Sequence, residues 1–125
     1  MLANVVGDDG PDGQRARTEL RAAAGEVSAP DLVDVETVTV LRKRWLAGTI
    51  SEERFAQSIG DLEQLAIQRY PTLPLMRRAY ELRDNLAPYD ASYVALAETL
   101  DCQLITGDHR PACATGPRCP IRLLN

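Results

Sequence analysis

Three carboxylates that lie far apart in the sequence, Glu36, Asp90 and Asp108, are the residues best suited to carry chemistry. Carboxylate oxygens are the ligands that hard divalent cations such as Mg²⁺ and Mn²⁺ prefer in proteins. A cation held among carboxylates can activate water and stabilise the negative charge that develops when a phosphodiester is hydrolysed. We therefore predict that the three side chains converge on one divalent metal site.

Glu36 lies in a segment that we expect to be helical, where it shares a face with Leu32, Val33, Thr39 and Val40. A carboxylate on an apolar face is costly unless it is paired or bound to a cation. The alternative is that the helix is rotated and Glu36 is exposed. The sequence favours these two interpretations about equally.

Asp90 falls in the first turn of the most apolar helix that the sequence predicts, which begins at Pro88 and ends near Leu100. The positive end of the helix dipole favours an ionised carboxylate there. A simple capping role is the commoner one for an aspartate near a helix start. If Asn85 or Ala87 takes the cap position instead, Asp90 can point at a site.

Asp108 follows a predicted buried strand over residues 103–106, after the turn residue Gly107. Open α/β sheets bind ligands beyond the carboxyl ends of their parallel strands. Thr106 and Asp108 can therefore aim at the same space. Taken alone, a Thr-Gly-Asp sequence is equally typical of an ordinary turn.

Helical and strand-like segments alternate along the chain. Residues 31–47 alternate like a strand, but the length of the uninterrupted run and the stop at Gly48 favour a helix. The order predicts one α/β domain over residues 1–125, with a parallel sheet and helices on both of its faces. The other expected elements are helices over 12–24, 73–86 and 88–100, a helix capped by Ser51, and short strands over 26–29, within 65–70, over 103–106 and over 121–124.

Composition narrows the class of protein. The formal net charge of −4 argues against a broad basic surface for nucleic acid, although bound cations reverse the local sign of a carboxylate cluster. No apolar run approaches the roughly twenty residues of a membrane span, and no signal peptide is visible, so a cytoplasmic protein without a membrane partner is expected.

The cysteines do not fit the usual zinc sites. Reduced thiols are expected, with a Cys113–Cys119 bridge as the less favoured alternative.

Three segments of the chain carry motifs that belong together. They are Asp31-Leu32-Val33-Asp34-Val35-Glu36, Tyr89-Asp90-Ala91-Ser92-Tyr93-Val94-Ala95-Leu96-Ala97 and Leu104-Ile105-Thr106-Gly107-Asp108. Together they resemble the PIN-domain ribonucleases, and specifically the VapC toxins of bacterial toxin–antitoxin pairs. Their order and spacing match that family, and the Tyr-Asp-Ala-x-Tyr-Val-Ala-Leu-Ala pattern is the most specific of the three.

The resemblance implies a three-layer α/β/α PIN-like domain with a short central parallel sheet. It also implies an endoribonuclease that uses Mg²⁺ or Mn²⁺ to cleave structured RNA of the tRNA or rRNA class, leaving a 5′-phosphate and a 3′-hydroxyl. Glu36, Asp90 and Asp108 would be the catalytic metal ligands, and Thr106 a supporting hydroxyl. The implied partners are a cognate VapB-type antitoxin and a second copy of the chain in a homodimer.

The start of the chain departs from the family pattern. Family members open with a strand ending in an aspartate that supplies a first metal carboxylate, whereas residues 1–6 look like the helix that follows it. We expect this aspartate to be encoded upstream of Met1. The alternative is a shortened, catalytically impaired relative that binds its antitoxin without cleaving RNA. A phosphoacceptor receiver domain is set aside because it needs a lysine after a late strand, and the only lysine is Lys43.

Overall fold

The computed structural model describes residues 7–22 and 27–124. They belong to two compact units, the first ending at Arg69 and the second beginning at Tyr70. The expected helix over residues 1–6, the end of the expected helix over 12–24 and the first residue of the expected strand over 26–29 lie outside the described residues. In the described part of the chain, every helix is too short or too polar to cross a membrane.

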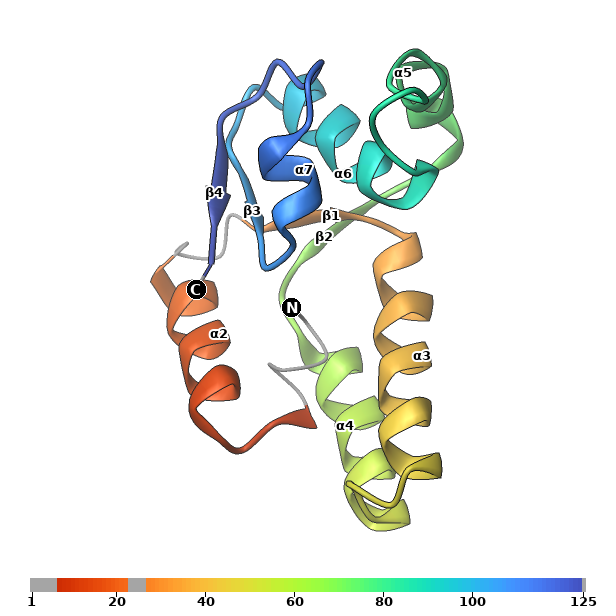
Figure 1. The fold of residues 1–125 in the computed structure, drawn as a ribbon. Helices are drawn as coiled ribbons and strands as arrows, with labels where there is room; N and C mark the ends of the chain where they lie inside the picture. Colours follow the sequence, from red (N-terminus) through yellow and green to blue (C-terminus); the bar gives the residue numbers. More distant parts are fainter. Residues whose placement is uncertain (1–6, 23–26, 125) are drawn as a thin grey trace. The chain divides into compact units, whose positions relative to one another are not determined.

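The first unit combines helices with a small sheet (Figure 1). Its two short strands pair with each other, and the two long helices, α3 and α4, are in contact. The helix interpretation of residues 31–47 is confirmed. The elements are α2 (Pro11–Ala22), β1 (Ser28–Pro30), α3 (Leu32–Leu46), α4 (Glu52–Gln64) and β2 (Gln68–Tyr70), of which the last residue, Tyr70, is the first of the second unit.

Local signals explain where the helices of the first unit begin and end. Ser51 caps α4 as predicted, because its hydroxyl accepts a hydrogen bond from the backbone N–H of Arg54 at 3.0 Å. Gly48 adopts a φ of 77° just after α3, a conformation that glycine takes without strain. Asp31 occupies the N-cap position of α3, where its side chain makes no capping hydrogen bond.

The second unit combines a parallel strand pair with helices that contact it. Leu104 of β3 lies opposite Ile121 of β4, and Thr106 lies opposite Leu123, which confirms the predicted parallel pairing. Both α6 and α7 contact β3 (Figure 1). The elements are the 3₁₀ turn η1 (Leu73–Leu75), α5 (Met76–Glu81), α6 (Pro88–Thr99), β3 (Leu104–Thr106), α7 (His109–Cys113) and β4 (Ile121–Leu123).

One expected helix of the second unit is shorter than predicted. The expected helix over 73–86 opens as a 3₁₀ turn and ends at Glu81. A turn follows, in which the backbone N–H of Leu86 donates to the carbonyl oxygen of Leu82 at 2.9 Å. Both leucines still reach the core, so the apolar spacing identified buried positions correctly while overstating the helix. The core cluster is formed by Ala79, Leu82, Leu86, Ala91, Val94, Ala97 and Leu104.

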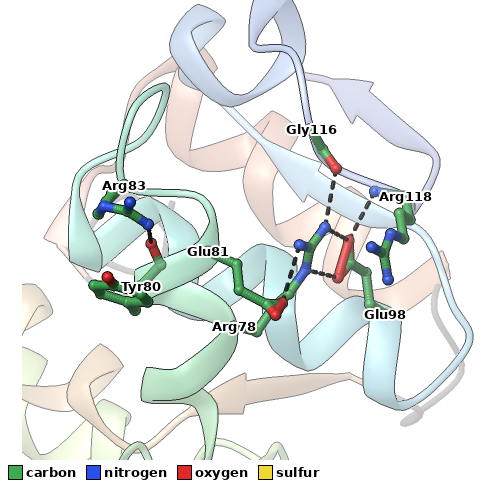
Figure 2. Close-up of polar contacts among 7 residues, drawn as sticks. All are labelled: Arg78, Tyr80, Glu81, Arg83, Glu98, Gly116 and Arg118. Atoms are coloured by element: carbon green, nitrogen blue, oxygen red, sulfur yellow. Dashed lines mark hydrogen bonds and ion pairs between the residues drawn. The ribbon is translucent and has the colours of Figure 1, made fainter.

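An ion-pair cluster joins α5, α6 and the loop before β4 (Figure 2). Arg78 donates to the two carboxylate oxygens of Glu98 at 2.7 and 3.2 Å and to the carbonyl oxygen of Gly116 at 2.9 Å. Glu98 also accepts the backbone N–H of Arg118 at 2.7 Å. The side chains of Arg78 and Glu98 are only 19% and 14% exposed. One guanidinium therefore holds three segments of the unit together.

Candidate metal centre

Asp90 lies in the first turn of α6, as the sequence predicted. Ala87 takes the N-cap position and Pro88 follows it, so Asp90 is not the capping residue. The next residues of the helix, Ala91 and Ser92, are buried, and Asp90 itself is half-buried. The amino end of α6 therefore carries a partly desolvated carboxylate where the helix dipole favours negative charge.

Asp108 lies where β3 passes into α7, beyond the carboxyl end of the strand. Its backbone N–H donates to Thr106 Oγ1 at 3.0 Å. Its carboxylate caps α7 by accepting the backbone N–H of Arg110 at 2.9 Å. Thr106 and Asp108 therefore lie together, as the sequence suggested, and the bond to Thr106 fixes the backbone just before the carboxylate.

The two aspartates have pKa values shifted in opposite directions. The Arg110 guanidinium donates to both carboxylate oxygens of Asp108, with Nε 2.9 Å from Oδ2 and 3.1 Å from Oδ1. This side-chain hydrogen bond, with the one from the Arg110 backbone, lowers the pKa of Asp108 to about 2. Burial raises the pKa of Asp90, and the negative charge of Asp108 raises it further, against the opposing charge of Arg110. The two carboxylates are thus close enough to repel each other, and an added cation would relieve that repulsion.

Glu36 belongs to the first unit, on α3. The buried stripe of this helix is Val33, Thr37 and Leu41, whereas Val40, on the face expected around Glu36, is 38% exposed. Val33, which was expected to share the face of Glu36, is buried, so the structure falls between the two interpretations that the sequence left open. Glu36 itself is half-buried.

The convergence of Glu36 with the two aspartates stays a prediction. Within the described part of each unit, no three His, Cys, Asp or Glu side chains gather closely enough to hold one ion. The second unit contributes Asp90 and Asp108, with the Thr106 hydroxyl beside the latter. These are hard oxygen donors with excess negative charge, a donor set that fits Mg²⁺ or Mn²⁺ and not a thiophilic metal.

Arg110 is the residue of this centre that sequence reasoning missed. It lies only two residues after Asp108, so the contact does not follow the three- or four-residue spacing that marks side-chain pairs on a helix. The available signal was an aspartate at the start of a helix with a basic residue in its first turn. That signal was hidden because α7 has only five residues and contains Pro111.

Replacing Arg110 with glutamine should raise the pKa of Asp108 from about 2 toward its ordinary value of 3.8. The substitution removes the guanidinium hydrogen bonds, which are the main cause of the shift, and keeps the capping backbone N–H. Because the folded-state pKa is depressed, this ion pair stabilises the fold above pH 3.8, and the stabilisation is lost as the pH falls toward about 2. NMR titration of the Asp108 carboxyl carbon measures the change.

His109→Gln is the matched control for that titration, because His109 makes the smallest of the contributions that lower the pKa of Asp108. Its effect on the pKa should be clearly smaller than that of Arg110→Gln. Equal shifts in the two variants would contradict the assigned ion pair.

Comparison with known proteins matches residues 2–115, a span that includes Glu36, Asp90, Thr106 and Asp108, to the PIN domain family. Ribonuclease VapC1 of Mycobacterium tuberculosis is 44% identical over 98 residues, which cover 78% of this chain and 74% of the relative. Ribonuclease VapC9 of the same organism is 38% identical over 102 residues, covering 82% and 80% of the two chains. Ribonuclease VapC12 is 34% identical over 114 residues, covering 91% and 87%.

Proposed function

This chain belongs to the VapC family of PIN-domain proteins, and from that membership we propose that it is a metal-dependent endoribonuclease. Relatives that are 34%, 38% and 44% identical to it are named ribonucleases. The local observation that carries the proposal is the Asp90–Asp108 pair, two mutually repelling carboxylates at the start of α6 and beyond the end of β3. Such a pair is suited to a cation and, through it, to a phosphodiester.

The proposed cofactor is Mg²⁺ or Mn²⁺, held by Asp90 and Asp108 with Glu36 as a third ligand. Once bound, the ion would polarise a water molecule for attack on the phosphodiester and offset the charge that develops on it. Asp90 would gain most from that positive charge, because burial and Asp108 both disfavour its ionised form. The Thr106 hydroxyl, which accepts the backbone N–H of Asp108, would keep the second carboxylate oriented.

The proposed setting is a toxin–antitoxin pair in which a VapB-type antitoxin restrains the nuclease. The VapC names of the relatives support this setting. The contact between Arg110 and Asp108 adds that one carboxylate of the candidate centre binds a guanidinium. An antitoxin arginine would act on Asp90 by the same charge-assisted hydrogen bonding. Structured RNA of the tRNA or rRNA class and a homodimeric assembly complete the proposal.

A cleavage assay tests the proposed function. The purified chain, and the same chain extended by any in-frame codons upstream of Met1, are incubated with bulk tRNA and with rRNA. Cleavage should require Mn²⁺ or Mg²⁺, stop with EDTA, and return when excess metal is added. The products should carry a 5′-phosphate, which a 5′-phosphate-dependent exonuclease detects.

Two other outcomes would contradict the proposed function. Equal cleavage with and without EDTA would contradict the metal requirement. If the chain and its extended form both fail to cleave tRNA and rRNA and yet bind a co-expressed VapB-type protein, that result would favour the non-catalytic binding module.

A further inference from the structure

Two cysteines lie at matching positions just before the parallel strands β3 and β4. Leu104 pairs with Ile121, and the same register continued two residues toward the amino end places Cys102 opposite Cys119. The ladder extends in that direction, because the backbone N–H of Leu104 donates to the carbonyl oxygen of Pro120 at 2.9 Å. The register therefore brings together two residues that are distant in the sequence.

Hydrogen bonds to the carboxyl end of α6 hold Cys102 and the residue that precedes Cys119. The backbone N–H of Cys102 donates to the carbonyl oxygen of Ala97 at 3.0 Å. Directly before Cys119, the backbone N–H of Arg118 donates to the Glu98 carboxylate at 2.7 Å (Figure 2). Ala97 and Glu98 are consecutive residues of α6, so the two cysteine segments are fastened to the same turn of one helix.

We propose that Cys102 and Cys119 form a reversible intramolecular disulfide when the chain meets a low-molecular-weight disulfide. Neighbouring strands lie roughly 4.7–4.9 Å apart, and disulfides accept Cα separations of about 4.4–6.8 Å. Register partners on parallel strands direct their side chains to the same face of the sheet. Both thiols are reduced in the structure. This modification site is independent of the proposed ribonuclease activity.

The exchange proceeds in two balanced steps. The thiolate of Cys102, which is exposed, attacks one sulfur of the small disulfide, so a mixed disulfide forms and one small thiolate leaves. The Cys119 thiolate then attacks the Cys102 sulfur, which closes the protein bridge and releases the second small thiolate. The two protein thiols lose two electrons and two protons, and the small disulfide is reduced to two thiols.

The rate of the second step should depend on pH. Burial raises the pKa of the Cys119 thiol, and the negative charge of Glu98 raises it further. The thiolate that closes the bridge is therefore scarce at pH 7 and becomes more abundant as the pH rises. Closure of the bridge from the mixed disulfide should accelerate accordingly between pH 7 and pH 9.

Peptide mapping tests the proposal on the full chain. The protein is equilibrated with mixtures of reduced and oxidised glutathione, its remaining thiols are alkylated, and it is digested with trypsin and an aspartate-directed protease. The three cysteines then fall in separate peptides, 101–107, 108–118 and 119–122. Mass spectrometry should find 101–107 linked to 119–122, with 108–118 alkylated.

Substitutions separate this bridge from other disulfides. Cys113→Ser should keep the same linkage, whereas Cys119→Ala should instead leave glutathione attached to Cys102. Linkage of 108–118 to either other peptide, or a bridge between two chains, would overturn the proposal. So would wild-type protein that carries glutathione on Cys102 at every ratio and never forms the internal bridge.

Discussion

Replacing Asp90 with asparagine should lower the rate of RNA cleavage by roughly 10²–10³-fold, the scale of losing one group that stabilises transition-state charge. The amide keeps the size of the carboxylate and removes its charge. The proposed cation would lose a ligand whose negative charge it stabilises strongly, since burial and Asp108 both raise the pKa of Asp90. The measurement is the initial rate of cleavage at saturating Mn²⁺.

The same variant should change thermal stability with a sign that depends on metal. Because the folded-state pKa of Asp90 is raised above 3.8, its ionised form destabilises the fold, and this cost appears as the pH rises through the raised value. At pH 7 with EDTA, Asp90→Asn should therefore melt at the same temperature as the wild type or higher. Saturating Mn²⁺ at 100 times its Kd should stabilise the wild type by about 2.7 kcal/mol and the variant by much less.

Asp84→Asn is the matched control, because Asp84 is an exposed aspartate of the same unit. It should leave both the cleavage rate and the response to metal unchanged. If Asp90→Asn cleaves RNA at the wild-type rate, or if Mn²⁺ stabilises the variant and the wild type equally, Asp90 is not a metal ligand.

Replacing Arg78 with alanine should destabilise the fold by about 2–4 kcal/mol, close to the cost of breaking a buried ion pair. The Glu98 carboxylate would lose two hydrogen bonds, and the carbonyl oxygen of Gly116 would lose its donor. Only 14% of the Glu98 side chain is exposed, so water replaces these bonds poorly. Urea denaturation measures the loss as a lower midpoint at an unchanged m-value.

Arg77→Ala is the control for that experiment, because Arg77 is the exposed neighbour on the same helix. Its midpoint should stay within about 0.5 kcal/mol of the wild type, as for most surface substitutions. A similar loss in both variants would show that the ion pair is not responsible for it.

The pH dependence gives an independent check on the same cluster. Burial alone would raise the pKa of Glu98, but the hydrogen bonds from Arg78 and from the Arg118 backbone lower it below 4.5. The cluster therefore stabilises the fold fully above pH 4.5, and this stabilisation is lost as the pH falls through the depressed pKa. Arg78→Ala should remove much of the acid sensitivity in that range.

The fold was predictable wherever a local signal was strong. Ser51 marked the start of α4, and the apolar run after Pro88 marked α6. The end of α5 was not predictable. Leu86 reaches the core through a turn, and a continued helix would have buried the same side chain. Apolar spacing reports which side chains are buried, and several backbone paths can satisfy it.

Only part of the arrangement of the candidate site could be predicted from the sequence. Asp90 and Asp108 were chosen for their places at a helix start and a strand end, and the second unit brings these together. The face of Glu36 could not be inferred, because the rotation of α3 depends on which row of side chains is covered by the rest of the unit. Arg110 was missed because its contact is local to a helix too short to show a period.

The capping of α7 by Asp108 has a consequence for conformational entropy. Fixing a flexible side chain on binding costs about 0.5–1.5 kcal/mol. For Asp108 that freedom is already lost on folding, because its carboxylate is held by Arg110 and its backbone by Thr106. The free energy that orders this short helix therefore also contributes to the affinity of Asp108 for a cation. Substitutions that fray His109–Cys113 should weaken cation binding even though they change no atom that contacts the cation.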